Sequence, residues 1–253
     1  MERVMPNENK IKAEILYNKY DVFRNLYMWY AWFGVFLIIL LVSEILMKKP
    51  LKELRYAIQF HKVVIIGLFV VHMAGLITRW YISGHAPWSD AYESLLYVAW
   101  AIMLFGLLLG RKSELTMAAA AFVVAIVLWV AHLNWLDPDV ANIQPVLDSY
   151  WLMIHVAVIV ASYGPFALGM ILGIITFILM IFSNDKNKKR MDLNIKQLTY
   201  INEAAITIGL IMLTIGNFLG GMWANESWGR YWAGILKRPG RLLASLFMPL
   251  YST

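Results

Sequence analysis

A tryptophan-rich segment at residues 220–232, GGMWANESWGRYW, carries the residue types best suited to bind a large planar ligand. Indole rings can form a flat apolar surface with polar N–H groups at its rim, and glycines let a backbone approach a ligand closely. A belt of interfacial aromatic residues, common in membrane proteins, is the alternative, but the clustering favours a ligand surface. The candidate binding residues of this segment are Trp223, Trp228, Gly229, Tyr231 and Trp232.

Histidines supply a second kind of chemistry. His155 lies four residues into the apolar stretch WLMIHVAVIVASYGPF. An ionisable side chain at that depth indicates function by default, and neutral imidazole is a good axial ligand for iron. A hydrogen bond to a helix carbonyl or a loop is the alternative. His72 lies in the middle of another apolar stretch, where a structural hydrogen bond is as plausible as ligation. His85 and His132 are expected to be exposed near one membrane face.

Residues 79–93, RWYISGHAPWSDAYE, join two apolar stretches through turn-forming residues. Asp90 and Glu93 precede the second stretch, which is typical of a helix start because acids there face the positive end of the helix dipole. Arg79 is expected to extend its charge to the interface, with pairing to an acidic group of a ligand as the alternative. The sequence contains no Walker loop, dinucleotide fingerprint, HExxH zinc motif or serine triad.

The composition explains where these residues must be held. Of 253 residues 60% are hydrophobic and 15% charged, and the mean hydropathy is +0.62. A soluble domain would carry about 25% charged residues, so we expect an all-α, polytopic helical bundle of an inner membrane. Because cysteine is absent, thiol catalysis, disulfides and Cys-ligated metals are excluded. The net charge of +6 reflects basic loops that set membrane topology, so it does not indicate nucleic-acid binding.

About six membrane spans are predicted, at residues 28–47, 62–79, 94–110, 117–135, 151–182 and 205–222. Lysine and arginine concentrate in the alternate loops at 48–61, 111–116 and 183–203, which the positive-inside rule assigns to the cytoplasm. Residues 80–93, 136–150 and 220–253 then lie on the outer side. The first 27 residues are predicted to be a polar, weakly amphipathic lead-in helix on the outer side, although they are basic for that position.

Three elements of this chain resemble the CcsA/ResC cytochrome c assembly proteins, including those fused to a CcsB part. They are HMAGLITRWYISGHAPWSDAYESL, WLMIHVAVIVASY and GGMWANESWGRYW. The resemblance identifies residues 28–232 as an incomplete haem-handling membrane domain and the tryptophan-rich segment as the family's WWD segment. It implies that haem b, as the transported ligand, is presented on the outer face of the bacterial inner (plasma) membrane. His155 would be an axial ligand, apocytochrome c the acceptor, and a CcsB/ResB-type subunit or fused domain a partner.

The chain departs from the family pattern after Trp232. The family continues with a sequence similar to YWGWDPKETWA, whereas residues 233–253 begin AGILKRPGR. Back-translation of residues 232–241 with permissible codons can give TGG GCT GGG ATC CTA AAG AGA CCT GGG CG. The same string read two bases later encodes GWDPKETWA. We therefore expect a lost base near codon 232, an aberrant tail at 233–253, and no complete cytochrome c maturation by the chain as written.

Two other functions remain open on the sequence alone. A b-type electron-transfer protein would need two histidines per haem at similar depths on facing helices, and His72 is the one histidine placed in mid-membrane. A secondary transporter would show repeated halves or broken helices in matching positions, and the sequence shows no such repeat.

Overall fold

A computed structural model describes residues 8–47, 51–133, 136, 138–139, 150–183 and 188–229. Most of the described residues are helical, as expected, and none of them forms a strand. The element order is α1 (Glu8–Tyr20), α2 (Val22–Leu46), α3 (Lys52–Ser83), α4 (Ala91–Leu109), the short 3-10 helix η1 (Gly110–Lys112), α5 (Glu114–Ala131), α6 (Tyr150–Ile181) and α7 (Lys188–Trp228).

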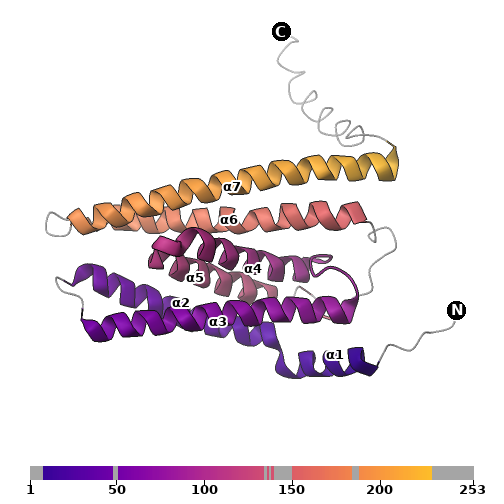
Figure 1. Cartoon of the computed structure of the whole chain (residues 1–253), viewed down its shortest axis with the longest axis horizontal. Helices are drawn as coiled ribbons and strands as arrows, with labels where there is room; N and C mark the ends of the chain where they lie inside the picture. The colour runs from indigo at the N-terminus through magenta and orange to yellow at the C-terminus, as the bar shows by residue number, and fades with distance from the viewer. Residues whose placement is uncertain are drawn as a thin grey trace, which may run out of the picture.

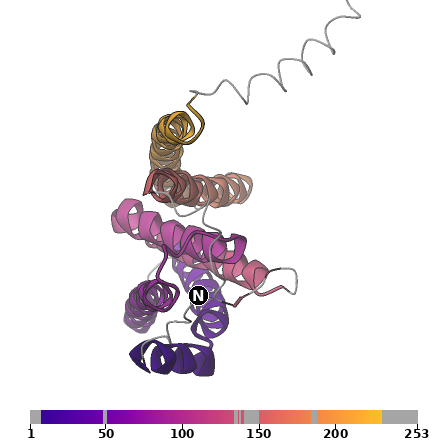
Figure 2. The same cartoon turned by 90° about the vertical axis from the view of Figure 1, so that its right-hand side faces the viewer.

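The helices lie side by side in layers (Figure 1). One outer layer is the pair α6 and α7, the middle layer holds α4 and α5, and α2 and α3 form the other outer layer. The end-on view in Figure 2 shows the same order. Because α6 packs mainly on α7 and α4, it joins the terminal pair to the rest of the bundle.

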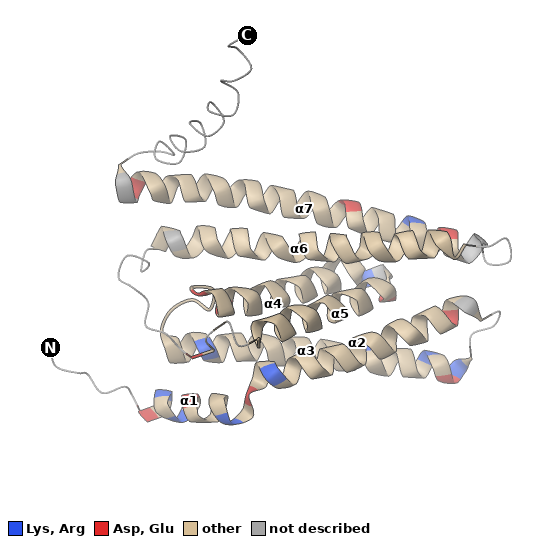
Figure 3. Ribbon diagram, turned by 180° about the vertical axis from the view of Figure 1, so that it is seen from behind, with Lys and Arg blue, Asp and Glu red and all other residues tan. Residues whose placement is uncertain are grey.

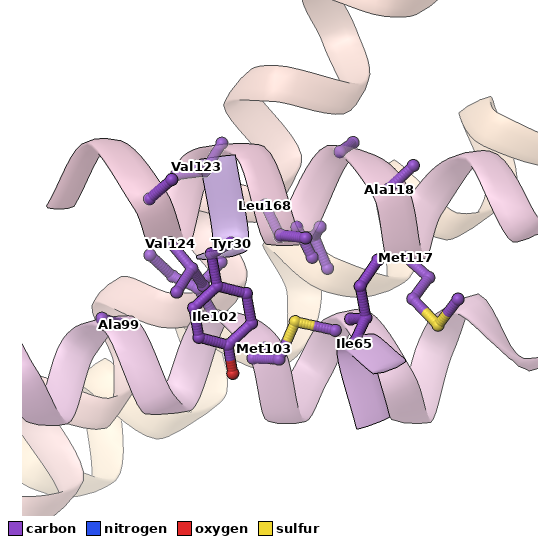
Figure 4. Close-up of a cluster of buried hydrophobic side chains, with 14 of the residues drawn as sticks. Tyr30, Ile65, Ala99, Ile102, Met103, Met117, Ala118, Val123, Val124 and Leu168 are labelled. Carbon is purple, nitrogen blue, oxygen red and sulfur yellow. The ribbon is translucent and has the colours of Figure 1, made fainter. Parts of the chain in front are cut away.

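The core is built on the small residues of α5. Ala118, Ala119, Ala120 and Ala121 are all fully buried, and small side chains allow membrane helices to approach closely. Larger apolar side chains from the surrounding helices fill the space between the backbones (Figure 4). The labelled members of this cluster are Tyr30, Ile65, Ala99, Ile102, Met103, Met117, Ala118, Val123, Val124 and Leu168.

Six helical stretches of the described chain are long and apolar enough to cross a membrane. They are Glu8–Ile45, Lys52–Ser83, Ala91–Leu109, Glu114–Ala131, Met153–Ile181 and Met191–Glu226. Charged residues gather near the ends of the bundle, while its middle is largely uncharged (Figure 3). The predicted number of spans is confirmed, although Trp135, the expected end of the fourth span, lies outside the described residues.

The ends of two spans differ from the prediction. Helix α7 begins at Lys188, so most of the expected loop at 183–203 is helical. With 41 residues it measures about 62 Å at 1.5 Å per residue, roughly twice the hydrocarbon thickness of a bilayer. The lead-in helix α1 ends at Tyr20, and Asp21 takes a left-handed conformation (φ 39°) before α2 begins.

Arg79, near the end of α3, is buried and hydrogen-bonded within the protein. The expectation that its charge extends to the interface is therefore wrong. Its side chain is fully buried, and its Nε donates to Oε1 of Glu93 at 2.8 Å. Its other nitrogens donate to the carbonyls of Pro138 and Asp139 at 2.8 and 3.1 Å, and its guanidinium lies 5.0 Å from the ring centre of Tyr92. An ion pair compensates the cost of burying this charge.

Two further histidines are less exposed than expected. His132 hydrogen-bonds through Nδ1 to the Leu128 carbonyl at 2.7 Å and packs against the rings of Tyr27 and Tyr92. His85 is half-buried, with its Nδ1 3.2 Å from the Ala86 carbonyl and 3.7 Å from a carboxylate oxygen of Glu93. Helix packing at this end of the bundle covers both side chains, and hydropathy could not predict that.

Candidate functional site

His155 lies in the second turn of α6, near the end of the bundle where α7 ends. Its side chain is 8% exposed, and its Nδ1 lies 2.8 Å from the carbonyl oxygen of Trp151. A carbonyl only accepts hydrogen bonds, so Nδ1 carries the proton and Nε2 keeps its lone pair. No described residue forms a hydrogen bond with Nε2. The helix thus presents His155 in the tautomer that binds metals through Nε2.

Helix α7 holds the imidazole from the side. The rings of Trp223 and His155 are stacked, with centres 5.4 Å apart and an angle of 27° between their planes. One turn earlier, a Cβ added to Gly220 would lie 3.3 Å from Cδ2 of His155. The missing side chain at Gly220 therefore leaves room for the imidazole, and Trp223 restricts its rotation.

Trp88, from the segment between α3 and α4, fixes the start of α6. Its Nε1 donates to the carbonyl oxygen of Met153 at 3.1 Å, two residues before His155. Its ring contacts the rings of Trp80 and Tyr97, with centres 5.9 and 4.7 Å away. The sequence places Trp88 in the outer segment 80–93, as one of several tryptophans expected to line an aromatic surface there, but does not predict its contact with α6. The available signal was a tryptophan in a turn rich in Ser, Gly and Pro.

The remaining aromatic candidates lie at or beyond the end of α7. Trp228 is the last residue of the helix, but its side chain is outside the described part of the structure, as are Tyr231 and Trp232. Gly229 follows in a left-handed conformation (φ 63°), which favours glycine at a helix end. A Cβ added there would meet nothing within 4 Å. Of the predicted site residues, the structure brings His155 and Trp223 into contact.

His72 belongs to a different part of the bundle. It is fully buried between α2, α3 and α4, and its Nε2 lies 3.1 Å from the Leu96 carbonyl. Its ring makes edge contacts with Phe23 and Tyr30, and within the described chain its Nδ1 has no hydrogen-bond partner. The structural hydrogen bond, one of the two expectations for His72, is therefore present.

Comparison with known proteins gives a consistent result. Residues 88–233, which include His155 and Trp223, match the family described as Cytochrome C assembly protein. Protein NrfI of Wolinella succinogenes is 46% identical over 232 residues, which cover 91% of this chain and 25% of that protein. The cytochrome c biogenesis protein CcsA of Parasynechococcus marenigrum is 30% identical over 247 residues, which cover 87% of this chain and 80% of CcsA. CcsA of Chlamydomonas reinhardtii is 34% identical over 184 residues, which cover 70% of this chain and 52% of that CcsA. The chain thus spans a quarter of NrfI and a larger part of these CcsA proteins.

Proposed function

Because the chain belongs to the cytochrome c assembly protein family, we propose that it binds haem b and presents it to apocytochrome c for covalent attachment. Haem is the ligand to be delivered. Residues 1–253 contain no cysteine, and in this proposal the acceptor protein supplies the thiols that react with haem. A CcsB/ResB-type subunit or domain is the proposed partner, and the bacterial inner membrane the proposed location.

The geometry of His155 carries this proposal. The hydrogen bond from its Nδ1 to Trp151 leaves Nε2 as the metal-binding atom, and the contacts with Gly220 and Trp223 fix the plane of the ring. An axial ligand held in this way orients the haem before the reacting groups meet. The reactivity belongs to the haem itself, and the protein contributes by binding and orienting it.

In this arrangement Trp223 supports the axial ligand His155, since its indole ring lies against the imidazole. The proposed planar surface for haem then consists of Trp228, Tyr231 and Trp232, with Gly229 allowing close approach. Aromatic rings of this kind suit an apolar macrocycle.

Charge favours placing this site on the outer side of the membrane. The opposite end of the bundle carries Arg55, Lys62 and Arg111, together with the basic start of α7. By the positive-inside rule that end faces the cytoplasm, which leaves His155 near the outer interface.

Replacement of His155 tests the proposal. The purified His155→Ala variant should retain several-fold less haem than the unchanged chain, and added imidazole should restore binding by filling the vacant ligand position. The control is His61→Ala, on α3 and towards the end of the bundle opposite His155. This variant should retain haem normally. Full haem occupancy in His155→Ala would contradict the proposed role of His155.

We also propose that residues 233–253 are read from a shifted frame, which the family-like sequence in the alternative frame supports. The test is to sequence the region of codon 232 in independent copies of the gene and in related strains. An intact copy should carry one additional G there. An identical reading frame in every copy would contradict the frameshift.

A further inference from the structure

A cavity lies at the end of the bundle opposite His155. Its volume is about 510 Å³, within the range of about 300–1,000 Å³ typical of small-molecule sites. It lies between the end of α2 and the starts of α3, α5 and α7, where charged residues gather (Figure 3). Its charged lining residues are Glu44, Arg55, Lys62, Arg111 and Glu114.

Basic side chains exceed acidic ones in this lining, three against two. Arg55 contacts Glu44 at 2.7 Å and Glu114 at 2.9 Å, and Lys62 contacts the other oxygen of Glu114 at 2.8 Å. Arg111 is exposed and forms no ion pair with any residue that the structure describes. Among the described residues, one positive charge of the cavity therefore has no ion-pair partner.

Two other features favour an anion with an apolar part. The cavity includes Ser113 and Glu114, where α5 begins, and the N-terminus of a helix attracts negative charge. Leu41, Ile45 and Leu115 supply an apolar wall next to the charged groups. Arginine binds carboxylate or phosphate through two parallel hydrogen bonds. A guanidinium that pairs with no described carboxylate, placed at such a wall, suits an amphiphile with an acidic head.

We infer that this cavity binds the carboxylate or phosphate group of an anionic amphiphile through Arg111, Arg55 and Lys62. Two molecules carry this chemistry at a membrane surface: haem, with its propionates, and an anionic phospholipid. Only the haem source depends on the proposed function. In either case Glu114 competes with the ligand for Arg55 and Lys62.

The test uses a His155→Ala background, so that the proposed outer site does not contribute to binding. The probes are haemin, haemin dimethyl ester, in which both carboxylates are blocked, and nanodiscs containing phosphatidylglycerol or only phosphatidylcholine. An Arg55→Gln/Arg111→Gln variant should weaken binding about tenfold, as expected for loss of charged hydrogen bonds. Glu114→Gln should strengthen binding, because it removes the competing carboxylate. Lys196→Gln, an exposed α7 residue outside the cavity, is the matched control.

Binding of haemin, but not of its ester, with these opposite effects would support the site with haem as the ligand. Selective, charge-dependent retention of phosphatidylglycerol without haemin binding would support the site with a lipid as the ligand. The inference is overturned if the arginine substitutions change the binding of neither haemin nor phosphatidylglycerol. It is also overturned if Glu114→Gln weakens binding, as the arginine substitutions are expected to do. Since the outer site is tested separately by imidazole rescue of His155→Ala, failure here leaves that proposal standing.

Discussion

At His155 two contacts control different properties of one ring. The hydrogen bond to the Trp151 carbonyl selects the tautomer, and the stack on Trp223 fixes the orientation of the ring. Neither contact uses Nε2, so both can persist when that atom binds iron. A residue that positions His155 should therefore affect haem retention without contacting haem.

Trp88 is such a positioning residue. A Trp88→Phe substitution keeps an aromatic ring beside Trp80 and Tyr97 but removes the hydrogen bond to the Met153 carbonyl. A net hydrogen bond of about 0.5–1.5 kcal/mol corresponds to roughly a two- to tenfold loss of haem affinity if it is needed to place His155. Titration of the purified variants with haemin measures this, with Trp29→Phe, at an exposed position on α2, as the control. Equal affinities in the two variants would rule out a role for the Trp88 bond.

Arg79 should affect stability more than ligand binding. Arg79→Gln leaves the fully buried Glu93 without its cationic partner, and breaking a buried pair on one side costs about 3–5 kcal/mol. Thermal unfolding in detergent should show a large fall in stability, while Arg24→Gln, which removes an exposed pair with Asp21, should change little. Similar unfolding curves for the two variants would contradict the structural role of Arg79.

The sequence places His155 near a span end and allows either iron ligation or a hydrogen bond to a helix carbonyl. The structure shows the hydrogen bond, and ligation stays a prediction. The environment of Arg79 was not predicted. Depth within an apolar stretch can be read from hydropathy. The convergence of Glu93 and the carbonyls of residues 138–139 on Arg79 depends on how three separate segments pack. The same holds for Trp88 and Gly220, whose partners lie on other helices.

Among the helices, the closeness of α6 and α7 decides whether the site can form. At Gly216 an added Cβ would lie 2.5 Å from Cγ1 of Ile159 and 3.2 Å from its backbone nitrogen. Gly216→Ala should therefore push α7 away from α6 and separate Trp223 from His155, which lowers haem retention several-fold. The matched control is Gly67→Ala, because a Cβ there meets nothing within 4 Å. Alanine at position 67 should leave haem binding unchanged and stabilise the helix by up to about 1 kcal/mol. Normal haem retention in Gly216→Ala would contradict this requirement for close packing.

Helix existence is easier to predict than helix ends in this chain. The apolar part of each span is visible in the sequence, and each predicted span overlaps one of the six apolar helical stretches of the described chain. The polar first part of α7 was expected to be a loop, because a hydropathy criterion detects apolar stretches and does not detect a polar helix that continues one of them. The break at Asp21 depends on a single left-handed residue, which hydropathy does not reveal.

For the whole molecule, charge asymmetry predicts orientation in the membrane. The chain contains no cysteine, so single cysteines can report which side of the membrane they face. Tyr56, near the start of α3, and Tyr150, at the start of α6, are 75% and 70% exposed. In intact cells a membrane-impermeant maleimide should label Tyr150→Cys but not Tyr56→Cys, and lysis should expose both. Labelling of Tyr56→Cys alone would reverse the proposed orientation, and with it the outer position of His155.

Exchange of the proposed axial ligand tests the central claim most directly. The His155→Cys variant is loaded with haemin, and its absorption and electron paramagnetic resonance spectra are recorded. If residue 155 binds the iron, these spectra should change from those of an imidazole ligand to those of a thiolate ligand. Haem accepts either ligand, and no other thiol is present in the chain. Trp223→Phe should weaken binding but keep the imidazole spectrum. An unchanged imidazole spectrum in His155→Cys would show that another residue binds the iron and would contradict the account.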